Sequence, residues 1–245
     1  MILSFISRHD FLELAFYGLF VFLLWLIVKN ALLAFDNVGY DGIEKRKRIL
    51  RFLGVLAMWL IYIGLLSASG FLNNLELPPR FPLLIILPLF IASGVFLWKY
   101  KRHPALHALP IHHAVGYQSF RIFIEVVFYG MFLEGVLPIV VTFEGYNMDI
   151  LIGISAPIVA LLVHKKWISR PLLILWNIAG IAVVLNAAFT FVTSFYFPSV
   201  WGEEQSMISS EFATFPYLLL PGFFMPSAIF VHLFSLVQLT SSPRN

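Results

Sequence analysis

The sequence contains no cysteine and has few charged residues. Only 12% of its 245 residues are Asp, Glu, Lys or Arg, whereas about 25% is usual for a soluble domain. The absence of cysteine excludes disulfide bonds, thiolate metal ligands and cysteine nucleophiles. The shortage of charge leaves too little polar surface to cover a water-soluble globule, so the composition argues against a soluble domain.

Apolar residues are abundant and come in long blocks. They make up 60% of the chain, and the mean hydropathy is +0.89. Blocks of about 18 or more apolar residues are typical of membrane-spanning helices. We therefore expect an all-α, polytopic transmembrane helix bundle that forms a single domain over residues 1–245. Seven spans are expected, at about residues 11–33, 49–71, 81–98, 118–141, 150–164, 171–195 and 216–239.

The basic residues gather in alternate connectors between the apolar blocks. Connectors one, three and five are basic, and connectors two, four and six are neutral or acidic. The positive-inside rule then predicts an N-terminus outside and a cytoplasmic C-terminus, and it explains the net charge of +3 without a nucleic-acid partner. A basic cluster beside a span also attracts anionic lipids. The strongest cluster comprises Lys45, Arg46, Lys47, Arg48 and Arg51.

The fourth expected span carries ionisable side chains, which are costly at bilayer depth. Gln118, Arg121 and Glu125 are spaced by three and four residues and share one helical face. The spacing predicts an ion pair between Arg121 and Glu125. Glu134 follows nine residues after Glu125, on the opposite face. It is the least readily explained residue of this span, because a helix-capping role for Asn147 or Asp149 accounts for the acidic connector but not for Glu134.

Three further polar residues fall inside later spans. Asn177 and His232 are expected at a depth similar to that of Glu125, and Asn186 at a depth similar to that of Glu134. Such residues either line a ligand-binding or proton-conducting cavity, or hold helices together by hydrogen bonds. Both interpretations remain open from the sequence.

The histidines offer a different chemistry. Imidazole binds zinc, copper, nickel and iron, including haem iron. The weak candidates for a metal site are His103, His107, His112, His113 and His164. No recognised metal-binding motif contains them, so no cofactor is predicted, and a haem or transition-metal protein stays open as an alternative.

Two runs resemble stretches of uncharacterised bacterial seven-span membrane proteins: TFEGYNMDILIGISAP (142–157) and LPGFFMPSAIFVHLFSLVQL (220–239). The resemblance implies a bacterial inner (plasma) membrane and no known activity. Three functions remain: a carrier or permease with a polar intramembrane cavity, an accessory subunit of a larger membrane complex, and a histidine-based redox protein. We rank the carrier first, do not predict an enzyme, and leave a protein partner or homo-oligomer open.

Overall fold

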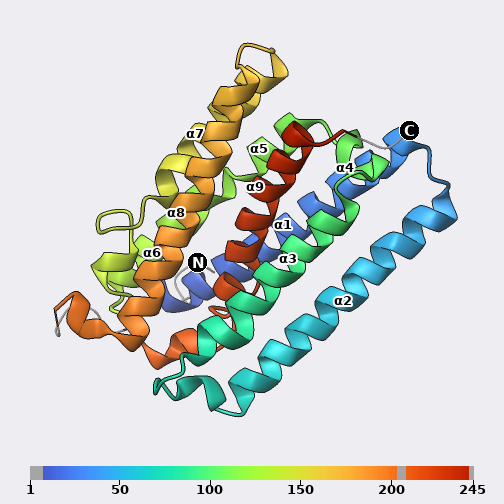
Figure 1. Ribbon diagram of the computed structural model, residues 1–245. Helices are drawn as coiled ribbons and strands as arrows, with labels where there is room; N and C mark the ends of the chain where they lie inside the picture. Colours follow the sequence, from blue (N-terminus) through green and yellow to red (C-terminus); the bar gives the residue numbers. More distant parts are fainter. Residues whose placement is uncertain (1–7, 203–207, 243–245) are drawn as a thin grey trace, which may run out of the picture.

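The computed structural model describes residues 8–202 and 208–242, and within these ranges every regular element is a helix (Figure 1). The α-helices are α1 (Arg8–Val38), α2 (Gly42–Ala68), α3 (Leu87–Tyr100), α4 (Pro104–Ala108), α5 (Ile111–Tyr117), α6 (Phe120–Leu133), α7 (Asp149–His164), α8 (Arg170–Tyr196) and α9 (Met225–Thr240). Two π-helical segments, η2 (Pro82–Ile86) and η6 (Leu220–Phe224), lead into α3 and α9. Short 3₁₀ turns are η1 (Phe71–Asn73), η3 (Ile139–Val141), η4 (Pro198–Val200) and η5 (Ser210–Ala213).

Five helical segments are long and apolar enough to cross a membrane: 10–38, 42–68, 82–100, 170–196 and 220–240. They correspond to five of the expected spans, and they indicate a membrane protein. The other two expected spans are shorter helices. Helix α7 has 16 residues, and the fourth expected span is divided.

The helical element at the fourth expected span differs from the expected range of 118–141. It begins earlier, with α5, and bends between α5 and α6, where Arg121 N–H bonds to Gln118 O and Ile122 N–H to Ser119 O. These i to i−3 bonds replace the α-helical pattern and tighten the turn. Helix α7 packs along both α5 and α6, so the two short helices act as one bent element.

This helical element also ends earlier than expected, at Leu133. Gly135 adopts a left-handed φ of +73°. Its N–H bonds to Phe132 O, and the next N–H, of Val136, bonds to Met131 O. This pair of bonds is a Schellman motif, which stops a helix and favours glycine at this position. The chain beyond, as far as Met148, is a connector rather than a span.

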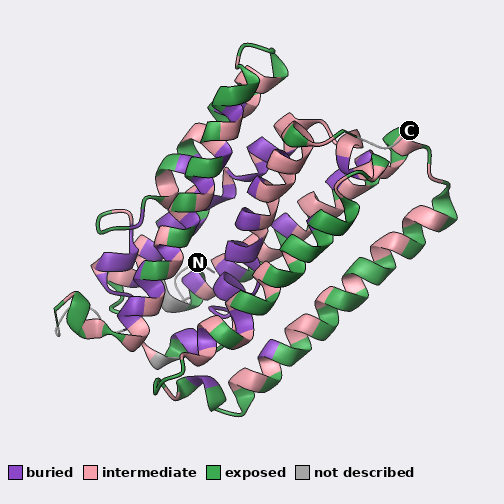
Figure 2. Ribbon diagram, viewed as in Figure 1, coloured by how far each residue is buried: buried purple, intermediate pink, exposed green. Residues whose placement is uncertain are grey.

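Helix α9 lies at the centre of the bundle and packs against α3, α5 and α8. In its most apolar stretch 61% of the residues are buried inside the protein, compared with 6% for α2. Figure 2 shows the same contrast, because buried residues concentrate around α9 and the α2 ribbon is almost entirely exposed or intermediate. Helix α2 is therefore a peripheral helix.

Two side chains of α2 donate to carbonyl groups that cannot accept the usual α-helical bond, because a proline lies four residues later. Proline has no N–H, so Pro226 cannot bond to Gly222 O, nor Pro88 to Leu84 O. Trp59 Nε1 lies 2.9 Å from Gly222 O, and the Tyr62 hydroxyl lies 3.3 Å from Leu84 O. Neighbouring helices commonly satisfy such freed groups in membranes. These bonds fix α2 to η6 and to η2.

Replacing Trp59 with phenylalanine should therefore loosen α2. We expect a loss of about 1 kcal/mol, since hydrogen bonds between membrane helices average roughly 0.6 kcal/mol and reach about 1.7. The matched control is Tyr62→Phe, whose bond is longer and exposed and should matter less. Unfolding in mixed detergent and dodecyl sulfate micelles would measure both, and a greater loss for Tyr62→Phe would contradict the assignment.

Candidate functional site

Arg121 is the central residue of the buried polar cluster, and only 1% of its surface is exposed. It comes from the first turn of α6. Its guanidinium binds Asp149, the first residue of α7, through two parallel contacts, with Nε 3.0 Å from Oδ2 and Nη2 paired with Oδ1. The bidentate geometry is the strongest form of this pairing. The sequence predicted Glu125 as the ion-pair partner of Arg121, but the partner is Asp149.

His232 of α9 continues the network on the other side of Arg121. Its Nε2 lies 3.3 Å from Arg121 Nη1, and its Nδ1 lies 3.0 Å from Asn177 Oδ1 on α8. The Asn177 amide nitrogen donates to Leu173 O at 2.8 Å, so Oδ1 is the acceptor. These partners assign a neutral imidazole with the proton on Nδ1 and the lone pair on Nε2 facing the arginine.

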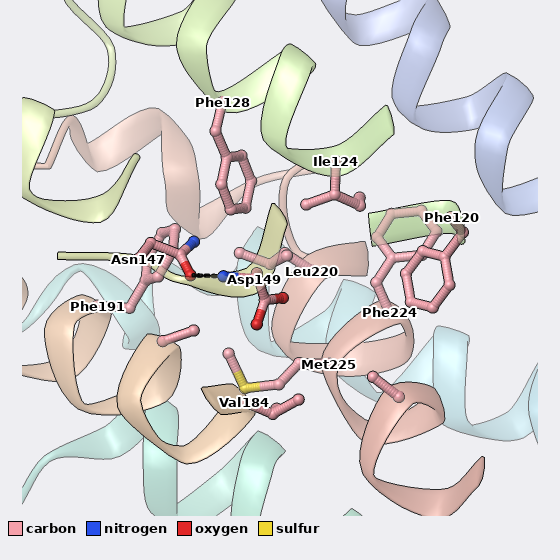
Figure 3. Close-up of a pocket in the computed structure, with 12 residues that line it drawn as sticks. Phe120, Ile124, Phe128, Asn147, Asp149, Val184, Phe191, Leu220, Phe224 and Met225 are labelled. Atoms are coloured by element: carbon pink, nitrogen blue, oxygen red, sulfur yellow. Dashed lines mark hydrogen bonds between the residues drawn. The ribbon is translucent and has the colours of Figure 1, made fainter. Parts of the chain in front are cut away.

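Glu125 joins the network through the connector before α7. Its Oε1 accepts a bond of 2.6 Å from Asn147 Nδ2. Asn147 Oδ1 in turn accepts the Asp149 N–H at 3.1 Å, drawn as a dashed line in Figure 3. A cavity of about 20 Å³ adjoins Asn147 and Asp149 and is otherwise lined by apolar side chains such as Phe128 and Val184. This volume suffices for about one water molecule.

The remaining polar candidates lie outside this network. Gln118 is buried and donates to Ala228 O at 2.9 Å. Asn186 donates to Tyr146 O at 2.7 Å and so fixes the connector before α7. Glu134 is the exposed C-cap residue of α6. The sequence analysis placed Glu134 inside a span, but α6 ends at Leu133, just before it.

The histidine candidates are divided among three places. His103 caps α4, and His107 Nε2 contacts Lys101 O at 2.8 Å. The ring of His112 lies against those of His113 and His164, with centroids 4.6 and 4.8 Å apart. Within residues 8–202 and 208–242, no three His, Asp or Glu side chains are arranged to hold a metal ion.

The three basic connectors lie at one end of the bundle, towards the top and upper right of Figure 1. They are the α1–α2 turn, the segment after α3, and the α7–α8 turn. In the first of these, Asp41 starts α2 by accepting the Glu44 N–H at 2.7 Å, and Lys45 pairs with Asp36 of α1. The basic cluster of α2 is thus positioned by the turn that precedes it.

A second cavity is larger and apolar, and it does not include the buried network. It has a volume of about 440 Å³ and lies between α1, α2, α3, α4, α5 and the η6–α9 segment. This is within the range of small-molecule sites, about 300–1,000 Å³. Its walls are mainly aliphatic and aromatic side chains, for example Phe35, Phe52, Leu56, Phe96 and Phe230. The sequence analysis missed this cavity, since its residues are scattered through the chain and look like ordinary lipid-facing positions.

The comparison with protein families matches residues 80–240 to a domain of unknown function, DUF8737. The match covers more than half of the chain. The protein belongs to the DUF8737 family. The DUF8737 segment contains every member of the buried polar network and both runs that resemble bacterial membrane proteins, whereas α1 and α2 precede it. Neither the curated proteins nor the solved structures gave a match.

Proposed function

We propose that this protein is a seven-span integral membrane protein that handles a lipid-like small molecule in its apolar cavity, in the manner of a carrier. The observation that supports it is the cavity of about 440 Å³ between a packed bundle and the peripheral helix α2. An apolar site of this size in contact with α2 favours a molecule that arrives through the bilayer.

The proposed spans are α1, α2, η2–α3, the bent α5–α6 element, α7, α8 and η6–α9. The shared position of the basic connectors supports a cytoplasmic side at that end, with the N-terminus outside and the C-terminus inside. A bacterial plasma membrane remains part of this proposal on the resemblance alone.

The polar residues have a different role in this proposal. Arg121 binds Asp149 and His232, and His232 binds Asn177. Glu125 joins them through Asn147, and the cavity beside them is about 20 Å³. A route for a polar substrate would need a wider space. We infer that the network holds α6, α7, α8 and α9 together. Of these four helices, α9 lines the apolar cavity.

Filling the apolar cavity should expel its occupant. Ser93 lines the cavity from α3, and its neighbour Ala92 is exposed on the same helix. After thorough detergent exchange, solvent extraction and mass spectrometry should find an apolar compound in the wild type and in the control Ala92→Phe. In Ser93→Phe we expect about a tenfold loss, which is about 1.4 kcal/mol of binding free energy. Equal amounts in all three proteins would overturn the proposal.

A further inference from the structure

The apolar cavity has one end that is chemically different from the rest, next to the α1–α2 turn and α4. Phe35 of α1, Phe52 of α2 and Ala105 of α4 line that end. The side chain of Arg48 is not part of this lining but lies beside it. Its guanidinium carbon lies 6.0 Å from the centroid of the Phe35 ring, and Arg48 precedes Phe52 by one helical turn on the same face of α2.

Arg48 is held in position but keeps donors for a ligand. Its guanidinium carbon lies 4.6 Å from the centroid of the Tyr40 ring. Its Nε lies 2.8 Å from Glu44 Oε1, in a pair that is about one third exposed. This contact is an ion pair without hydrogen-bond geometry, since Arg48 Nε has no hydrogen-bond partner, so it does not use up the N–H donors of the guanidinium. The two terminal nitrogens are the atoms that bind phosphate or carboxylate in pairs.

His103 and Tyr40 add a second donor at the same end. The Nδ1 atom of His103 accepts the Ala105 N–H at 3.2 Å, so the ring proton is on Nε2, which lies 3.3 Å from the Tyr40 hydroxyl. Burial, followed by the nearby charge of Arg48, lowers the pKa of His103 below its ordinary value. A neutral His103 donates to Tyr40, and the Tyr40 O–H then remains available to an anion.

The depth of the cavity offers little to a polar ligand. Apart from Ser93, its polar side chains already bind other side chains or the backbone. Asn30 Oδ1 lies 3.0 Å from His113 Nδ1, and the Tyr117 hydroxyl donates to Ser227 at 3.1 Å. Trp59 donates to Gly222 O. An occupant therefore needs an apolar part in the depth and a polar part only at the end beside Arg48.

The net positive charge at the end of the cavity beside Arg48 favours a ligand with an acidic head group. Around the α1–α2 turn and the end of α3, nine basic residues outnumber three acidic ones, Asp36, Asp41 and Glu44. The basic residues are Lys29, Lys45, Arg46, Lys47, Arg48, Arg51, Lys99, Lys101 and Arg102. Such clusters attract anionic membrane lipids.

We propose that the cavity binds an anionic membrane phospholipid, with an acyl chain among the apolar side chains and the phosphate at Arg48 and Tyr40. The inference rests on the proposed function, because it specifies the occupant of the same cavity. It places the head group at one arginine rather than over the basic cluster as a whole.

The test is native mass spectrometry of the detergent-purified protein with two lipids that have the same dioleoyl chains. One is the anionic phosphatidylglycerol, and the other is the zwitterionic phosphatidylcholine. The wild type should prefer phosphatidylglycerol by about tenfold. Arg48→Gln should reduce the preference to about twofold or less. The matched control is Arg46→Gln, which removes the same charge from the opposite, exposed face of α2 and should retain the preference.

The possible outcomes separate the two proposals. Equal binding of both lipids by the wild type, with both lost in Ser93→Phe, would overturn the preference for an anionic head group and leave the apolar cavity in place. If neither lipid bound, the cavity proposal would be overturned as well. An equal loss of preference in Arg46→Gln and Arg48→Gln would replace the specific site with diffuse attraction. Arg48→Lys, which keeps the charge, covers the case in which Arg48→Gln unfolds, and it should retain a preference of at least threefold.

Discussion

Replacing Arg121 with alanine should destabilise the protein by about 3–5 kcal/mol, the usual cost of removing one partner from a buried ion pair. The substitution leaves the Asp149 carboxylate without its bidentate partner. It also removes the donor to His232 Nε2. Equilibrium unfolding in mixed micelles with dodecyl sulfate measures the loss.

The Arg121–Asp149 ion pair should contribute less to the free energy of unfolding than the cost of Arg121→Ala suggests. A buried pair replaced on both sides by apolar residues is often neutral or stabilising. The double variant Arg121→Met with Asp149→Leu should therefore be more stable than Arg121→Ala. Arg102→Ala, on an exposed arginine after α3, is the control and should be close to neutral. A loss below about 1 kcal/mol for Arg121→Ala would show that the pair is not buried as described.

The sequence predicts the helical membrane fold well, because long apolar blocks determine it. It predicts the bend and the end of the fourth span poorly. The apolar run continues past Gly135, so hydropathy alone extends the helix to residue 141. The stop signal was nevertheless visible, since Gly135 is followed closely by Pro138, and glycine with a later proline is typical of a helix end.

The buried network was predictable in its members but not in its pairs. The spacing of Arg121 and Glu125 favoured an ion pair within one helix, which the structure does not contain. Asp149 binds Arg121 instead, although it lies 28 residues later in the chain. The connector before α7 determines which carboxylate binds Arg121, since its Asn147 donates to Glu125 and accepts the N–H of Asp149.

The apolar cavity could not be predicted from the sequence at all. Its walls come from six separate helices and the η6 segment, and no local pattern distinguishes a residue that faces a cavity from one that faces lipid. The position of α2 creates the space, and Trp59 fixes that position through a carbonyl that Pro226 frees. A proline in α9 thus determines where a helix more than 150 residues earlier is attached.

Replacing Gly180 with alanine should have the second-largest effect, about 1–3 kcal/mol of destabilisation. A Cβ atom at this position would lie 2.2 Å from both Cε1 and Nε2 of His232, far inside van der Waals contact. The imidazole cannot move away freely, because Asn177 and Arg121 hold both of its nitrogens. The methyl group must therefore break at least one of these bonds. Gly94→Ala on α3 is the control, since its Cβ meets no atom within 4 Å.

The cause can be isolated with a double-mutant cycle. In a His232→Ala background the clash is absent, and Gly180→Ala should cost less than about 0.5 kcal/mol or stabilise the helix slightly. Unfolding of the wild type, the two single variants and the double variant gives the coupling energy directly. If Gly180→Ala destabilised both backgrounds equally, the added methyl group would be clashing with a group other than His232. A strong coupling would establish that Gly180 is there to admit His232, and thereby Arg121, into the centre of the bundle.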